Sequence, residues 1–219
     1  MDDVPNANRE KTRMRHYPRP RIVVFAGLLL SLSLATGSTS VQAADETRPN
    51  ILIAISDDQS FPYASAYGCR GVSTPGFDRV AREGVLFTNA IAASPGCSPS
   101  RAALLTGLHP WQLEHAGTHG SWFPTKFQTY PERLAELGYF VGYTGKGWGP
   151  GDFSGRPSNP AGREFAGITA KPPFNGMKSN DYASNFAEFL KQKPSDRPFC
   201  FWYGASEPHR VFEMDSWQK

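Results

Sequence analysis

The stretch Pro49-Asn50-Ile51-Leu52-Ile53-Ala54-Ile55-Ser56-Asp57-Asp58 decides the fold class of this chain. Its central part, residues 51–55, is continuously apolar and rich in β-branched isoleucine. Runs of this kind are typical of a strand that is buried on both faces in a parallel sheet. The two aspartates stand at the carboxyl end of this strand, where open α/β sheets place their functional sites.

Outward from this strand, strand patterns and helix patterns alternate along the chain. Helices are expected where an N-cap residue or an early proline precedes an apolar stripe and a glycine follows it. Further strands are expected at 85–88, 139–143 and 199–203, and helices at 75–84, 99–105, 129–137 and 180–191. Residues 145–176, rich in Gly, Pro, Ser and Asn, are expected to form a long loop, either a lid or a substrate wall. The alternation predicts an α/β fold with a mostly parallel sheet flanked by helices.

The first 43 residues have the pattern of a secretory signal peptide. A basic region up to Arg21 precedes an apolar run at 22–34 and a small-residue site at Val41-Gln42-Ala43-Ala44. The apolar run is too short to span a bilayer stably, so a single-pass anchor is the less favoured alternative. We therefore expect cleavage after Ala43, no stable membrane insertion afterwards, and a periplasmic or extracellular domain from residue 44 to residue 219.

Composition and cysteine count narrow the function class. The chain has 219 residues, 39% of them hydrophobic, and a net charge of +3. Disorder is therefore not expected, and the charge is too small to indicate nucleic-acid binding. The three cysteines leave at least one thiol without an internal partner. Cys69 and Cys200 either pair or remain buried thiols, whereas Cys97 has a distinctive context.

The segment Cys97-Ser98-Pro99-Ser100-Arg101-Ala102-Ala103-Leu104-Leu105-Thr106-Gly107 places a nucleophile just before a predicted helix. A helix N-terminus favours anions because its first N–H groups are free and its dipole is positive there. Arg101 falls on the first turn, from which a guanidinium can bind an oxyanion with two bonds. The segment thus indicates a reactive cysteine facing a sulfate-like or phosphate-like group. The alternative is an ordinary loop cysteine before a capped helix.

The whole string, C-x-P-S-R followed by x-x-L-x-T-G, resembles the signature of the type I sulfatases, which share an alkaline-phosphatase-like fold. The resemblance implies that Cys97 is converted to formylglycine by a formylglycine-generating enzyme, whose recognition sequence includes Pro99 and Arg101. It also implies that Arg101 orients the hydrated aldehyde. One hydroxyl of the hydrate would attack sulfur and form a sulfate ester, and the second would then expel sulfate.

The same resemblance extends to the first strand, where P-N-I-L-x-x-x-x-D-D is similar to the sulfatase pattern. It implies that Asp57, Asp58 and the modified Cys97 bind one divalent cation, usually Ca²⁺. Oxygen ligands suit such a hard cation, and the cation would polarise the sulfate. By itself, a pair of aspartates also fits a helix cap or a turn.

Two further residues match the family pattern at strand ends. Lys146, in G-Y-x-x-x-x-x-G-K, would bind sulfate oxygens, and His209, in Glu207-Pro208-His209, would contact the sulfate and protonate the leaving group. The alternatives are a solvated lysine and a surface histidine. The chain departs from the pattern at Trp148 and Ser206, where the family often has histidines.

The loop from His109 to Phe123 carries aromatic residues and the histidines His115 and His119. Stacking rings and polar donors suit a sugar, so this loop is either a substrate wall or a packed loop with satisfied histidines.

The resemblance covers residues from about Arg48 onward, the front part of the family fold. Family members are usually more than twice as long and carry a second acidic metal pair downstream, whereas only Glu213 and Asp215 follow His209, in no such motif. The sequence therefore predicts the N-terminal portion of a sulfatase domain, apparently truncated.

The predicted activity is hydrolysis of sulfate esters, or N-sulfate, of a sulfated glycan. The motif G-Y-x-G-K-x-W-G-P-G and the E-P-H-R segment are most similar to heparan N-sulfatase (sulfamidase) relatives. The alternatives are a phosphonate or phosphodiester hydrolase of the same superfamily, and an inactive sulfate-binding remnant.

Overall fold

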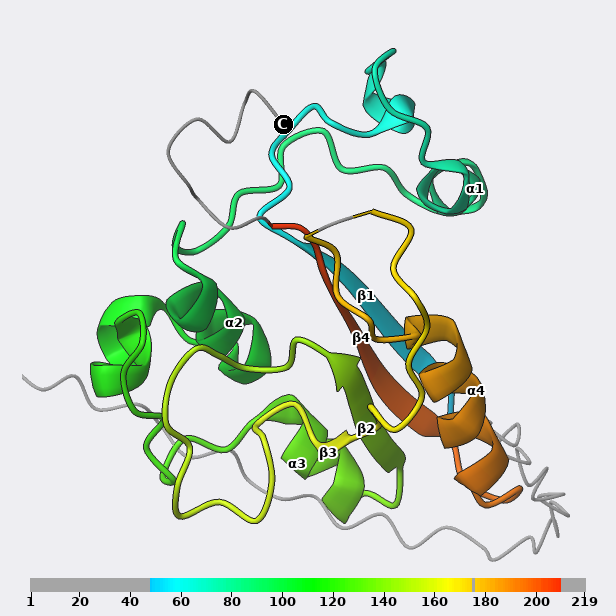
Figure 1. Cartoon of the computed structure of the whole chain (residues 1–219). Helices are drawn as coiled ribbons and strands as arrows, with labels where there is room; N and C mark the ends of the chain where they lie inside the picture. Colours follow the sequence, from blue (N-terminus) through cyan, green and yellow to red (C-terminus); the bar gives the residue numbers. More distant parts are fainter. Residues whose placement is uncertain (1–47, 175, 210–219) are drawn as a thin grey trace, which may run out of the picture. The chain divides into compact units, whose positions relative to one another are not determined.

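Four parallel strands form the sheet of this protein, in the order β1-β4-β2-β3 (Figure 1). The computed structural model describes residues 48–174 and 176–209. The strands are β1 (Ile51–Asp57), β2 (Phe140–Gly145), β3 (Arg163–Glu164) and β4 (Phe199–Pro208). Their register brings Ile53 of β1 and Tyr143 of β2 opposite Trp202 of β4. The predicted parallel sheet is therefore confirmed.

Helices cover the sheet on both sides: α4 lies on one side, and α2 and α3 on the other (Figure 1). The α-helices are α1 (Pro75–Glu83), α2 (Cys97–Thr106), α3 (Tyr130–Glu136) and α4 (Tyr182–Gln192), and short 3₁₀ turns lie at Ser65–Tyr67, Pro110–Gln112 and Glu114–Gly117. All four predicted helices are confirmed within a few residues. The one functional difference is that α2 begins at Cys97, so the predicted nucleophile lies on the helix and not before it.

Local chemistry explains the helix ends. Thr129 and Glu132 form a reciprocal capping box at the start of α3, with Pro131 in the first turn. Gly107 ends α2 with a φ of 71°, a left-handed conformation that glycine adopts without steric cost.

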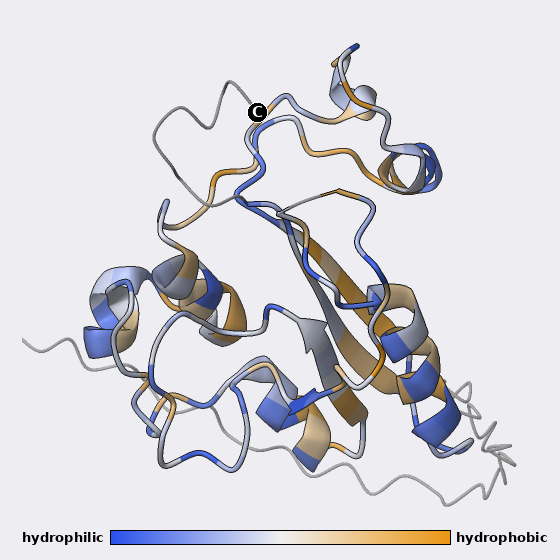
Figure 2. Ribbon diagram, viewed as in Figure 1, coloured by the Kyte–Doolittle hydropathy of each residue, from blue (hydrophilic) through white to orange (hydrophobic). Residues whose placement is uncertain are grey.

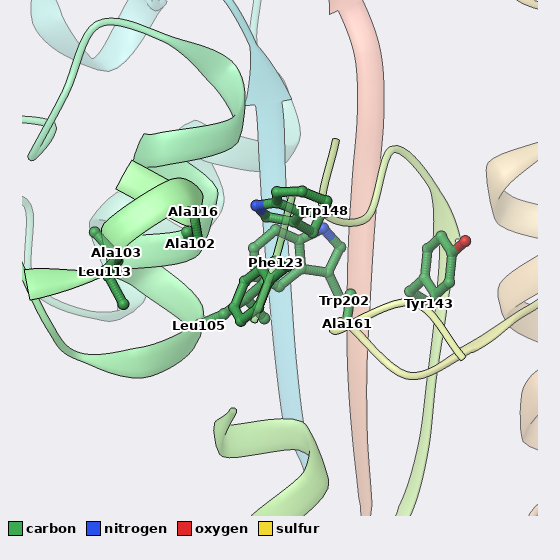
Figure 3. Close-up of a cluster of buried hydrophobic side chains, with 10 residues drawn as sticks. All are labelled: Ala102, Ala103, Leu105, Leu113, Ala116, Phe123, Tyr143, Trp148, Ala161 and Trp202. Atoms are coloured by element: carbon green, nitrogen blue, oxygen red, sulfur yellow. The ribbon is translucent and has the colours of Figure 1, made fainter. Parts of the chain in front are cut away.

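Alternation along β4 supplies a core to each face of the sheet. Trp202 faces α2 and packs with Leu105, Phe123 and Trp148, as Figure 3 shows. Its neighbour Phe201 faces α4 and packs with other aromatic rings. The hydropathy colouring shows the same arrangement, with apolar residues along the strands between the helices (Figure 2). The sheet thus has an apolar layer on each face.

Two sequence-based expectations are wrong. Residues 85–88 form no strand, because they pair with no strand in the described part of the chain. Val85 and Phe87 are accordingly 78% and 68% exposed. The first strand is not buried on both faces, since Leu52 is 51% exposed. Here β1 is at the edge of the described sheet, and its Leu52 side is not fully covered.

The predicted signal peptide lies outside the described residues. Across 48–174 and 176–209, no helix is long and apolar enough to cross a membrane. All three cysteines have free thiols, with Cys200 buried and the other two partly exposed, so the pairing of Cys69 with Cys200 is not formed.

Candidate active site

Four predicted site residues come together at the carboxyl ends of the strands. Asp57 ends β1, Lys146 follows β2, and His209 follows β4, while Cys97 is the first residue of α2. All four line one cavity of about 670 Å³. Parallel strands place their carboxyl ends at one edge of the sheet, which is why residues so distant in sequence meet there.

Asp57 is the centre of this group. Its side chain is buried, and ligand-type atoms of Asp57, Cys97 and His209 all lie within 4.8 Å of one another. The Cys97 Sγ atom donates a weak hydrogen bond to Asp57 Oδ1 at 3.8 Å. On the other oxygen, the Lys146 ammonium forms an ion pair with Oδ2. The Asp57 carboxylate therefore contacts both Cys97, the predicted nucleophile, and Lys146, the side chain predicted to bind sulfate.

Arg101 is buried and is not among the residues that line the cavity. Its guanidinium donates to the carbonyl oxygens of Lys146, at 2.6 Å, and Gly147, at 2.9 Å, and pairs with Asp57 Oδ1 at 3.4 Å. Burial lowers the pKa of Arg101, and the neighbouring Asp57 carboxylate opposes that effect. In this arrangement Arg101 holds the loop after β2 and orients Asp57. The sequence-based expectations were that its guanidinium can bind an oxyanion and that it orients the hydrated aldehyde at position 97.

The position of Cys97 favours an anion. Its helix has ten residues, and Gly96, the N-cap residue, has extended backbone angles and no side chain to occupy the first N–H groups. The positive end of the helix dipole therefore acts beside the Lys146 ammonium. Together they would stabilise negative charge that develops at position 97 or on a bound sulfate.

Of the two departures from the sulfatase pattern, Trp148 has a structural role through its side chain, and Ser206 bonds through its backbone. Trp148 is buried, and its indole Nε1 donates to the carbonyl oxygen of Ser98 at 3.0 Å. Ser206 lines the cavity, and its backbone N–H donates to the hydroxyl of Tyr182 at 3.0 Å. The family's first histidine position after Lys146 is thus filled here by a packing residue.

Glu207 is a cavity residue whose carboxylate the sequence reasoning did not single out. It accepts hydrogen bonds from the Lys178 backbone N–H at 2.9 Å and from the Tyr182 hydroxyl at 2.8 Å. Burial would raise the pKa of Glu207, but these hydrogen bonds outweigh it and leave that pKa below its usual value. Glu207 thus presents a charged carboxylate at the cavity wall.

Long-loop residues complete the wall, among them Asn159 and Lys178. No spacing rule points to them, since the loop between β2 and α4 has little periodic structure. His119 also lines the cavity, whereas His115 contacts the ring of Trp122, with ring centroids 6.1 Å apart. The substrate-wall interpretation of the 109–123 loop therefore agrees with the placement of His119, and the packed-loop alternative agrees with that of His115.

The residues present fit a hard cation only in part. Asp57 offers a buried carboxylate, but Asp58 is exposed, has a φ of 60°, and is not part of the Asp57, Cys97 and His209 group. Ca²⁺ usually takes six to eight oxygen ligands. Among the expected ligands, the described residues therefore offer a hard cation one buried carboxylate, that of Asp57.

Comparison with known proteins agrees with this geometry. The profile of the Sulfatase family matches residues 49–219. The chain is 39% identical over 142 residues to an N-acetylgalactosamine-6-O-sulfatase of Bacteroides thetaiotaomicron, covering 58% of this chain and 28% of the relative. It is 32% identical over 196 residues to an N-acetylglucosamine-6-O-sulfatase of the same organism, covering 83% of this chain and 34% of the relative. The chain thus spans about a third of the length of these relatives.

A solved structure of a 2-O GAG sulfatase has the same fold. It superposes with a TM-score of 0.57 at 25% identity, over 74% of this chain and 35% of that one. The alkaline-phosphatase-like sulfatase fold is therefore confirmed. The expected similarity to sulfamidases is corrected, because the similar proteins named above are O-sulfatases, two of them sugar 6-O-sulfatases. With the family profile covering most of its length, this chain belongs to the sulfatase family.

Proposed function

We propose that this chain carries the nucleophile-bearing part of a glycan O-sulfatase, which hydrolyses a sulfate ester on a sulfated sugar. One observation carries the proposal: ligand-type side-chain atoms of Asp57, Cys97 and His209 lie within 4.8 Å of one another. This group lies at a helix N-terminus and beside Lys146. The names of the relatives support a sugar 6-sulfate as the first substrate to test.

The proposal assigns a role to each of these residues. Cys97, once converted to formylglycine, supplies a hydrated aldehyde with two hydroxyls on one carbon. Lys146 and the α2 N-terminus bind the sulfate oxygens and hold sulfur near position 97. Asp57 lies 3.8 Å from the position 97 side chain, close enough to accept the proton of an attacking hydroxyl.

His209 acts on the leaving side of the first step, after which the second hydroxyl at position 97 loses its proton and expels sulfate, which restores the aldehyde. As the bond between sulfur and the sugar oxygen breaks, that oxygen needs a proton, and His209 lines the same cavity. A Ca²⁺ ion held by Asp57 would add polarisation of the sulfate. Since the described residues offer only part of its ligand set, we assign no step to it.

The test is turnover by the formylglycine-bearing protein of three substrates: N-acetylglucosamine 6-sulfate, an aryl sulfate and an aryl phosphonate. The proposal expects sulfate release from the first two, and none from a Cys97→Ala control. Faster turnover of the phosphonate would favour the phosphonate hydrolase alternative. Binding of the sugar sulfate without release would favour the sulfate-binding remnant.

A further inference from the structure

Four side chains, which we call the clasp, connect α2, the loop after β2 and β4: Ser98, Arg101, Trp148 and Trp202. Arg101 and Trp202 hold the loop from the core side, since both donate to the carbonyl oxygen of Lys146, at 2.6 and 3.0 Å. Ser98 and Trp148 hold the helix. The clasp thus joins the backbones that carry Cys97 and Lys146.

Trp148 reaches the helix with a fixed geometry. Its ring is 3% exposed and packs edge-to-face on the buried ring of Phe123, with centroids 5.1 Å apart and planes at 86°. This packing directs the indole N–H onto the carbonyl oxygen of Ser98, at 3.0 Å. Figure 3 shows Trp148 and Phe123 next to each other beside α2.

Ser98 is held through its hydroxyl as well. It is completely buried, donates to the carbonyl oxygen of Pro150 and accepts from the backbone N–H of Gly120 at 3.3 Å. A serine in the first turn of a helix often bonds its own helix. Here the hydroxyl bonds to two loops, at Pro150 and Gly120, and the carbonyl oxygen bonds to Trp148. Three hydrogen bonds thus hold the residue next to Cys97.

We propose that Ser98 and Trp148 are positioning residues, which set the place of the Cys97 side chain relative to Asp57 and Lys146. The catalytic part of this proposal rests on the proposed function. We assign these residues more than a packing role because the hydrogen bonds of the Ser98 hydroxyl and of the Trp148 indole all fix Ser98, which adjoins the nucleophile. Ordinary core packing needs the rings, whereas positioning needs the indole N–H and the serine hydroxyl.

The test therefore removes those groups with the smallest change of shape that natural residues allow, and the exchange readout below separates the lost bond from the lost volume. Trp148→Phe deletes the indole N–H but keeps an aromatic ring, and Ser98→Ala deletes one hydroxyl while retaining Cys97, Pro99 and Arg101 for maturation. Ser195→Ala is the control, because Ser195 is exposed, lies outside the 109–123 loop and does not line the cavity. Aldehyde content is measured by mass for each variant, so that kcat is expressed per modified chain.

The first readout, hydrogen exchange, does not depend on activity. We expect both variants to speed amide exchange in residues 97–105 at least about tenfold, the equivalent of about 1.4 kcal/mol, while 199–203 in β4 stay as protected as in the parent. The second readout is kinetic: kcat per modified chain should fall about 10- to 100-fold, as expected for a misplaced nucleophile, with KM changed less than about threefold. The double variant should lose less than the product of the two single losses.

Unchanged exchange in 97–105, or an equal rise in 97–105 and 199–203, overturns the proposal and leaves only packing. So does an unchanged kcat per modified chain in a parent that turns over sulfate. If the parent bears the aldehyde but releases no sulfate, the proposed function fails instead, and the exchange data alone decide whether the clasp fixes the helix start.

Discussion

Asp57→Asn should destabilise the protein more than a typical single substitution at its surface. The Asp57 carboxylate is 5% exposed and pairs with the buried Arg101 guanidinium and the Lys146 ammonium. The amide keeps one acceptor oxygen but no charge, so two cations remain with no anion between them. Removing one partner of a buried ion pair costs about 3 to 5 kcal/mol. Because an acceptor remains, we expect the lower end, about 3 kcal/mol.

Thermal unfolding followed by circular dichroism measures this effect. For a domain of this size, 1 kcal/mol lowers Tm by about 2 to 4 °C, so Asp57→Asn should lower Tm by about 6 to 12 °C. Asp58→Asn is the matched control: Asp58 is exposed, and asparagine tolerates its φ of 60°. A Tm for Asp57→Asn equal to or above that of the parent would refute the reasoning, because it would show that the two cations need no buried anion.

Three further predictions concern single residues. His209→Ala should reduce sulfate ester hydrolysis about 10²- to 10⁴-fold, with a loss that grows across aryl sulfates as the pKa of the leaving alcohol rises; a uniform loss would argue against proton donation. Because the pKa of Glu207 is lowered on folding, its stabilising effect is present above the unfolded pKa and lost as pH falls through the folded pKa. The difference in Tm between parent and Glu207→Gln should therefore be largest near neutral pH and shrink below about pH 4, the usual range of glutamate; a difference independent of pH would contradict this. Burial raises the pKa of Cys200 to about 11, so at pH 8 iodoacetamide should label Cys69 before Cys200, as peptide mass spectrometry would show; equal labelling would contradict the buried position of Cys200.

Much of the fold could be predicted because its signals are local. The apolar run at 51–55, the proline and glycine boundaries of the helices and the capping box at Thr129 all depend on neighbouring residues, and all predicted helices are present. The failure at 85–88 has a different cause. That segment has strand-like composition, but a strand also needs a partner, and sequence composition does not provide that information.

The candidate site was predictable in its members and less so in their arrangement. Asp57, Cys97, Lys146 and His209 were identified from motifs, and the structure brings all four to one cavity. The motif could not show that the Arg101 guanidinium bonds to backbone carbonyl groups, because those contacts depend on the loop after β2.

The remaining residues of the cavity wall could not be predicted, because their placement depends on contacts between residues distant in sequence. The Glu207 carboxylate is fixed by Lys178 and Tyr182, residues that lie 29 and 25 positions away in the sequence. Asn159, another wall residue, also comes from this loop. Contacts of this kind follow from tertiary packing, not from any pattern that a reader of the sequence can recognise.

The central claim is that position 97 is the nucleophile of a sulfatase, and the mass of the peptide spanning Cys97 tests it most directly. The measurement uses protein exported by a host with an active formylglycine-generating enzyme. The expected peptide is lighter by the conversion of cysteine to aldehyde and reacts with a hydrazide. An unmodified thiol in every copy would contradict it.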